Sequence, residues 1–385
     1  MCFAELSAAI PETGGTYVFL RRAYNSNLIS FAFAWMMCFA YGTGAVAVVA
    51  IMAATFLVPV LAGFGLNMIE YVNETAVVLI VLLTLLNSRG VRHGGLTQNV
   101  LTILKTSLLL LVILIPLFLV DMQPARLVQG GVGNDGLATT LQNVGNAMIL
   151  CLFSFSGAYF VTHVAEEVRE PQKNIPRAII VGFLIVFGLY LLVNVTYMST
   201  MSFAEVKSSE HIASDVMARA LGPKGAVVTA FVIFCSAVGV LNAQLLNYPR
   251  IVFALARDGY FFQRIARVNE RGRAPSNAIL LVGVIASIFA LSGSYVEIMG
   301  YIAFVIHFFV SLAVLAVIVL RIREPDLPRP YKVWGYPFTP VAFLLISAVY
   351  LFNLIVNKPA AVMIGVSIVL AGVPFYFYWG RKKAA

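Results

Sequence analysis

This sequence has few charged residues. Only 11% of its 385 residues are charged, whereas 61% are hydrophobic. Ordinary soluble domains contain about 25% charged residues. The composition therefore excludes a soluble globular protein and indicates an integral membrane protein. Apolar runs leave no room for a separate soluble domain, so the sequence predicts one transmembrane domain over residues 1–385.

Cysteine is also scarce. The four cysteines, Cys2, Cys38, Cys151 and Cys235, lie far apart within apolar runs. This spacing fits neither a disulfide framework nor a zinc site. We therefore expect the cysteines to serve as small, buried hydrophobic residues. His163 and His307 also lack partners at ligand spacing, and the sequence predicts no metal site.

The common enzyme motifs are missing as well. The sequence contains no GxSxG, no HExxH, no Walker loop and no paired carboxylates in a buried polar segment. It therefore predicts no cofactor and disfavours a membrane-embedded enzyme. The net charge of +9 does not indicate nucleic-acid binding, because the basic residues stand in short loops between apolar runs. There they are better interpreted as determinants of membrane topology.

What the chain does have is apolar runs long enough to cross a bilayer. It opens with an apolar half-helix that ends at Pro11 and lacks the basic segment and cleavage site of a secretory peptide. Ten complete spans are predicted after it, at residues 28–58, 74–88, 101–120, 144–167, 177–199, 226–254, 275–292, 296–320, 338–356 and 360–379. Between two of them, residues 211–221 have helical periodicity and are expected to form a connector helix on the outer face rather than a lid.

Basic residues gather in every second loop. With the loop after the half-helix inside, 20 of the 26 lysines and arginines fall on the inner side and five on the outer side. This asymmetry follows the positive-inside rule. It predicts a multi-pass protein of the cell (cytoplasmic) membrane with its C-terminus in the cytoplasm.

The span 144–167 combines an apolar helix with a weak point. Ser154, Ser156 and Gly157 stand among the aromatic residues Phe153, Phe155 and Tyr159. Glycine disfavours a helix interior by about 1 kcal/mol relative to alanine, and a span that unwinds inside a membrane must line a cavity. Discontinuous transporter helices hold small charged molecules in this way. A plain helix with small residues for close packing is the alternative.

Four ionisable side chains lie within apolar segments: Glu5, Lys105, His163 and His307. Such groups are costly in hydrocarbon and often functional. Lys105 lies about one turn into its span, so it either extends to the headgroups or faces the bundle as a fixed cation in place of sodium. Glu5 is either a proton site or, as favoured, a packing carboxylate hydrogen-bonded to a neighbour.

Uncharged polar residues cluster in the span 226–254, which contains Ser236, Asn242, Gln244 and Asn247, followed by Tyr248 and Pro249. Helix–helix hydrogen bonds account for most of them. A polar ligand opposite the interrupted helix is the alternative, and spacing alone does not choose between the two.

Four stretches resemble one family, the amino acid–polyamine–organocation (APC) permeases. CFAELSAAIPETGGTYVFLRRAYN is similar to the end of their second helix and the first inner loop, and FSFSGAYFVTHVAEEVREPQKNIPRAI to their sixth helix. GVLNAQLLNYPRIVFALARDGYFFQRIARVN resembles their eighth helix and the loop after it, and REPDLPRPYKVWGYPFTP the inner loop before helix eleven.

The resemblance implies an all-α integral membrane fold, the inverted-repeat helical bundle of the leucine-transporter type, with alternating access about a central site. In the family's numbering the ten spans are helices three to twelve and the half-helix is the end of helix two. Helix one, with the glycine-rich break that binds substrate, is absent. A start codon internal to the gene is the favoured explanation, and a truncated relative is the other.

The resemblance also implies roles for particular residues. Phe155, Ser156, Gly157 and Ala158 match the unwound part of helix six, whose backbone would bind an α-amino group, with Phe153 or Tyr159 as a wall of the pocket. Gln244 matches a specificity position, and Lys105 matches the helix-five lysine that takes the place of sodium. Tyr41 and Thr43 on helix three are weaker candidates, and Glu5 is carried as a second ion-coupling candidate.

These residues together predict a sodium-independent secondary transporter for an amino acid or related amine, acting by proton symport or exchange. Its expected partners are the amino acid, protons and the lipid bilayer, and not nucleic acid. The alternatives are a non-transporting receptor on the same scaffold and an inactive, N-terminally truncated permease.

Overall fold

The protein is built from α-helices throughout the part of the chain that the computed structural model describes. That part comprises residues 1–66, 68–121, 123–126, 136, 139–140, 154–155, 157–293 and 295–384, and it contains no β-strand. Eight helical segments within these ranges are long and apolar enough to cross a membrane. The expectation of an all-α membrane protein is confirmed.

The helices follow the apolar runs in chain order. The first half of the chain forms α1 (Cys2–Ala9), α2 (Thr16–Tyr24), α3 (Asn27–Phe39), α4 (Tyr41–Ala62), α5 (Val72–Ser88) and α6 (Val91–Leu119). The middle forms η2 (Phe160–Glu167), α9 (Pro171–Thr200), α10 (Phe203–Ser208), α11 (Ile212–Leu221) and α12 (Lys224–Arg257). The remainder forms α13 (Ser276–Ser292), α14 (Tyr295–Arg323), α15 (Phe338–Asn357), α16 (Pro359–Leu370) and α17 (Val373–Ala384).

The predicted span 28–58 is two helices rather than one. α3 and α4 meet at Ala40, whose backbone leaves helical geometry at φ −142° and ψ −77°. A Cβ at position 42 would lie 2.3 Å from the carbonyl oxygen of Met37, so only glycine fits this junction. Apolar residues continue on both sides of the junction, and for this reason hydropathy did not reveal it.

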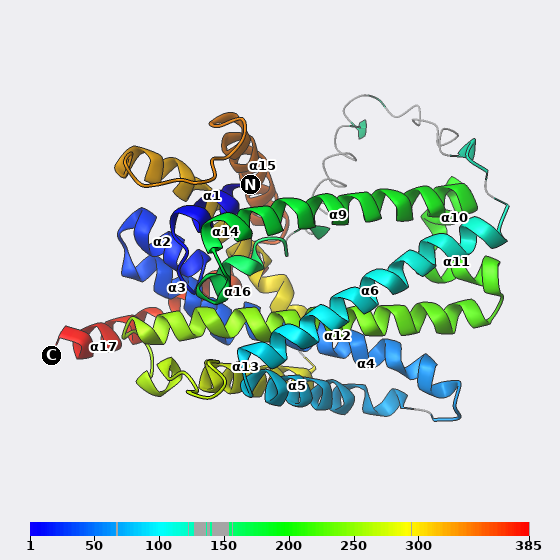
Figure 1. Ribbon diagram of the computed structural model, residues 1–385, viewed down its shortest axis with the longest axis horizontal. Coiled ribbons are helices and arrows are strands. Elements are labelled where there is room, and N and C mark those ends of the chain that lie inside the picture. Colours follow the sequence, from blue (N-terminus) through cyan, green and yellow to red (C-terminus); the bar gives the residue numbers. More distant parts are fainter. Residues whose placement is uncertain are drawn as a thin grey trace.

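α12 is the centre of the bundle and packs against α3, α4, α5, α6, α11 and α13. Figure 1 shows α12 running along the length of the bundle with α4 beside it, while α6 crosses α12 obliquely and α9 lies on the other side of α6. Small residues allow the close approach of neighbouring helices. At Gly283 of α13, an added Cβ would lie 2.4 Å from the Thr84 hydroxyl of α5.

Two ends of the bundle differ in charge. α10 and α11 lie at one end of α9, far from α2 and α17 at the other (Figure 1). The second end carries Arg21, Arg22, Arg257 and Arg323, and we call it the basic end. Most apolar residues of α9 and α15 are not buried by other parts of the protein. Such surfaces suit a lipid environment.

Candidate functional site

The predicted break in the family's sixth helix falls on a stretch without regular α-helix. Residues 157–159 form a turn, and Phe160–Glu167 form the 3-10 helix η2. The amide of Phe160 donates to the carbonyl of Gly157 (3.2 Å), and the amide of Thr162 to that of Tyr159 (3.0 Å). These three-residue spacings belong to turns and 3-10 helices. Ser156 and Phe153, also predicted here, lie outside the described residues.

The backbone at the turn is open. Gly157 and Ala158 are exposed, and a Cβ added to Gly157 would meet no atom within 4 Å. The glycine is therefore not required by packing in this conformation. What it provides is a backbone that a small molecule can approach closely.

Two aromatic side chains of the predicted site, Phe155 from the expected unwound part and Tyr159 from the expected wall, contact different neighbours. Phe155 packs on α9, with ring centroids 5.1 Å from Phe183 and 5.3 Å from Tyr190. Tyr159 instead stacks on Phe3 of α1 at 4.4 Å, with an interplanar angle of 18°. The sequence grouped Phe155 and Tyr159 at one pocket, and the structure separates their contacts.

Helices α4 and α12 bring a tyrosine group to η2. The phenols of Tyr41, Tyr159 and Tyr248 are close enough to interact electrostatically, and the ring of Tyr248 meets that of Phe160 edge to face at 5.3 Å. Tyr248 was not among the predicted site residues. Its position four residues after Gln244, on the same helix face, could have indicated it.

Gln244 and Thr43 are both buried. The Thr43 hydroxyl donates to the carbonyl of Cys38 (3.1 Å), so its hydrogen is used by its own helix junction. Gln244 differs, because its Oε1 has no hydrogen-bond partner within the described residues. A buried acceptor of this kind is available to a donor from a ligand.

Lys105 lies on α6 where that helix meets α12. Its side chain is half-buried, and its Cδ lies 3.5 Å from the position of a Cβ at Gly239. The lysine stem thus lies in ordinary van der Waals reach of α12 at Gly239. No hydrogen bond or ion pair of the ammonium is found among the residues that the structure describes.

A chain of side-chain amides joins the three helices α5, α12 and α6. Asn87 of α5 donates to Asn242 of α12 (2.9 Å), and Asn242 donates to Gln98 of α6 (2.8 Å). Gln98 in turn donates to Thr102, one turn before Lys105 (3.2 Å). Asn242, one of the polar residues of span 226–254, therefore forms helix–helix hydrogen bonds, which is one of the two roles considered for that cluster.

Glu5 is fully enclosed among positive partners. Its carboxylate accepts two hydrogen bonds from Arg321 (2.8 and 2.6 Å) and one from the amide of Val333 (2.6 Å). Arg329 lies 3.7 Å from the same carboxylate, and only 3% of the Glu5 side chain is exposed. The carboxylate thus joins α1 to α14 and to the loop after it.

Ion pairs join the segments at the basic end. Arg250 of α12 forms two hydrogen bonds with Glu167 (2.9 and 3.1 Å), and Arg257 forms two with Glu166 (3.0 and 3.1 Å). Glu166 also accepts from the amide of Thr13 (2.9 Å). The end of η2 is therefore held both by α12 and by the loop between α1 and α2.

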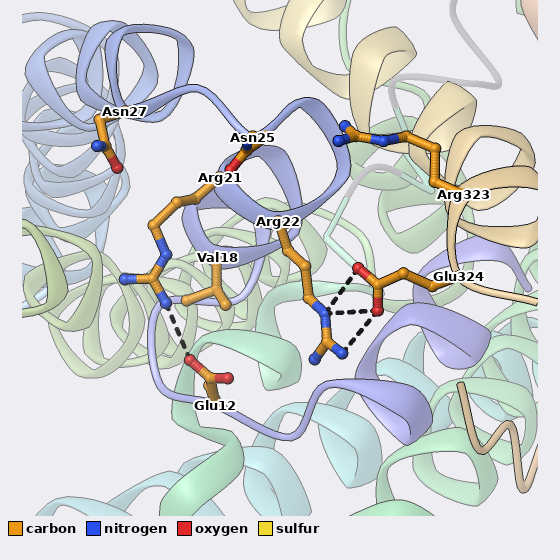
Figure 2. A pocket seen from close by; sticks show the side chains of 8 residues that line it. All are labelled: Glu12, Val18, Arg21, Arg22, Asn25, Asn27, Arg323 and Glu324. Atoms are coloured by element: carbon orange, nitrogen blue, oxygen red, sulfur yellow. Dashed lines mark hydrogen bonds and ion pairs between the residues drawn. The ribbon is translucent and has the colours of Figure 1, made fainter. Parts of the chain in front are cut away.

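A charged cavity of about 480 Å³ opens at the same end. Figure 2 shows its lining, in which Arg22 contacts the carboxylate of Glu324 with its guanidinium. These hydrogen bonds hold the pKa of Glu324 below its ordinary value. Glu12 and Arg21 pair across the cavity at 3.1 Å. The cavity belongs to the ion pairs of the basic end and is not the predicted substrate site.

Comparison with known proteins finds a family and relatives that match along the chain. The profile of the amino acid permease family matches residues 1–377. The human b(0,+)-type amino acid transporter 1 is 29% identical over 100% of this chain and 78% of its own length. The human Asc-type amino acid transporter 1 is 29% identical over 99% of this chain and 73% of its own length. The human large neutral amino acids transporter small subunit 2 is 27% identical, with 99% and 71% covered.

These matches run along nearly the whole chain and confirm the resemblance inferred from the four stretches. The family and the relatives are transporters rather than enzymes. Together with the apolar helices, they establish a multi-pass membrane protein whose substrates are amino acids. The chain belongs to the amino acid permease family.

Proposed function

We propose that the chain carries a neutral or modestly polar amino acid by alternating access, without sodium, in exchange for a second amino acid or together with a proton. The observation that carries the proposal is the open turn at residues 157–159, directly before the 3-10 helix η2. Freed amides and carbonyls at such a break can bind the charged ends of an amino acid. One relative is named for large neutral amino acids, which supports the uncharged substrate.

The proposed site uses the residues identified from the sequence. The backbone of residues 155–158 binds the α-amino group, Phe153 or Tyr159 forms an aromatic wall, and the unpartnered Gln244 oxygen selects the side chain. Tyr41 and Thr43 are contributed by α4. The Lys105 ammonium, without a partner among the described residues, stands where another transporter binds sodium.

Exchange in proteoliposomes tests this proposal. The purified chain, reconstituted and loaded with unlabelled amino acids, is expected to take up labelled neutral amino acids equally well in sodium and in choline buffers. A requirement for sodium contradicts the coupling proposed here. Absence of both uptake and exchange for all twenty amino acids contradicts the transport proposal itself.

Replacing Gly157 with valine is expected to lower exchange by about tenfold, or ~1.4 kcal/mol of barrier. A β-branched side chain restricts the backbone and covers the groups that substrate must reach. The fold should survive, because nothing lies within 4 Å of the new Cβ. Gly182→Val on α9 is the matched control, since that position is equally open. Equal rates in the two variants would remove the turn from the mechanism.

The proposal also places the basic end, and with it the C-terminus, in the cytoplasm. With the native cysteines replaced by alanine, Lys382→Cys is expected to react with a membrane-impermeant maleimide only after cells are permeabilised. Lys207→Cys on α10, at the other end of the bundle, should react in intact cells. The reverse pattern would invert the topology.

A further inference from the structure

His163 is a buried titratable residue for which the proposed transport mechanism gives no role. It lies in η2, and 1% of its surface is exposed. Neither Nδ1 nor Nε2 has a hydrogen-bond partner within the part of the chain that the structure describes. Buried imidazoles normally satisfy at least one ring nitrogen. The arrangement therefore calls for an explanation beyond packing.

The loop between α1 and α2 closes over this imidazole. The amide of Gly14 donates to the His163 carbonyl (3.0 Å), and a Cβ on Gly15 would lie only 2.6 Å from the imidazole Cδ2. Gly15 has a φ of +49°, a conformation that suits glycine. On the other side, the ring of Phe160 stacks on the imidazole at 5.8 Å. In this conformation these contacts keep the imidazole covered from water.

A charged imidazolium would find no free counter-ion among the described residues that enclose it. Each carboxylate of the surrounding elements is already paired with arginine: Glu166 and Glu167 of η2 with Arg257 and Arg250 of α12, Glu12 and Asp258 with Arg21 of α2, and Glu5 of α1 with Arg321. The Tyr159 ring lies 6.2 Å from the imidazole, centroid to centroid, and its phenol is in turn near the phenols of Tyr41 and Tyr248. Burial without a counter-ion disfavours the charged form, so the imidazole is neutral while the loop is closed.

We propose that His163 couples transport to pH. It binds a proton from the water at the basic end of the bundle, which we call the basic side of the membrane, only when residues 13–15 have separated from η2. The proton adds to a free ring nitrogen lone pair, and its release must precede closure. Because the proton binds one conformation and not the other, acid on the basic side favours the open conformation. This inference rests on the proposed alternating-access function and names a residue that links it to protons.

Exchange measured against the pH on the basic side tests the proposal. An imidazole in water titrates at about pH 6.5. The population of the open conformation should therefore rise by roughly five- to tenfold as the pH falls from about 7.5 to 5.5, and the exchange rate should change with it. His163→Phe keeps an aromatic ring of similar size and is expected to flatten this profile. His211→Phe, at the other end of the bundle, is the matched histidine control and should keep the slope. The same slope in His163→Phe as in the unaltered chain overturns the proposal.

A second measurement does not depend on transport. In a chain without native cysteines, Thr13→Cys should be labelled faster by an impermeant thiol reagent as the basic side becomes acidic, relative to the same chain that also carries His163→Asn. The ratio of the two rates cancels the pH dependence of thiol chemistry. A ratio that does not change with pH overturns the proposal. If the unaltered chain shows no exchange, the proposed function fails, and this ratio still decides the role of His163.

Discussion

Exchange by the Lys105→Ala variant is expected to fall by at least about tenfold at neutral pH, or ~1.4 kcal/mol of barrier. The lysine stem lies against Gly239 between α6 and α12, and the ammonium has no partner among the described residues. A fixed cation there would stabilise the two parts of the bundle in the manner of a bound sodium ion. Its removal leaves that place without a charge, so the transport cycle slows while the helices remain folded.

Lys358→Ala, in the loop before α16, is the matched control and should transport normally. Thermal unfolding of both variants in detergent should agree with the unaltered chain, because a half-buried lysine without a partner among the described residues contributes little to stability. Normal exchange by Lys105→Ala would show that the ammonium extends to the lipid headgroups, as the other interpretation of the sequence held.

The Glu5→Ala variant is expected to lose about 3–5 kcal/mol of stability, because removing one partner of a buried ion pair leaves the other charge unpaired. Here the loss affects Arg321 and Arg329 together, and the Val333 amide also loses its acceptor. Fluorescence-detected thermal unfolding in detergent should show a strongly lowered midpoint or loss of the folded peak.

Glu12→Ala provides the control for Glu5→Ala. The Glu12 side chain is 41% exposed in its pair with Arg21, and exposed pairs contribute at most about 1 kcal/mol. If Glu5→Ala were as stable as Glu12→Ala, and instead changed the pH dependence of exchange, Glu5 would be a proton site rather than a structural carboxylate.

Several features of the fold were predictable because they depend on local sequence. Long apolar runs fixed where α5, α9 and α12 lie, and the glycine in a run of aromatics indicated an irregular segment at residues 157–159. The junction of α3 and α4 was not predictable. It depends on the approach of a Met37 carbonyl to Gly42 inside an unbroken apolar run.

The candidate site divides in the same way. Gln244, Gly157 and Lys105 were identified because their residue types are unusual within apolar segments. Their neighbours were not identified: the contact of Tyr159 with Phe3 spans the chain from α1 to η2. The pairing of Glu5 with Arg321 joins residues 316 positions apart, and the sequence could only leave two roles open for this carboxylate.

The amino-acid sequence by itself therefore determined the class of protein, the family and the approximate place of most helices, since hydropathy and motifs are properties of short segments. Tertiary structure alone decided which arginine pairs with which carboxylate, which helix Lys105 and Phe155 contact, and how the loop at Gly14 and Gly15 covers His163. The physical reason is that lipid and protein interior are both apolar. A membrane helix is hydrophobic on every side, and its sequence does not show which side meets another helix.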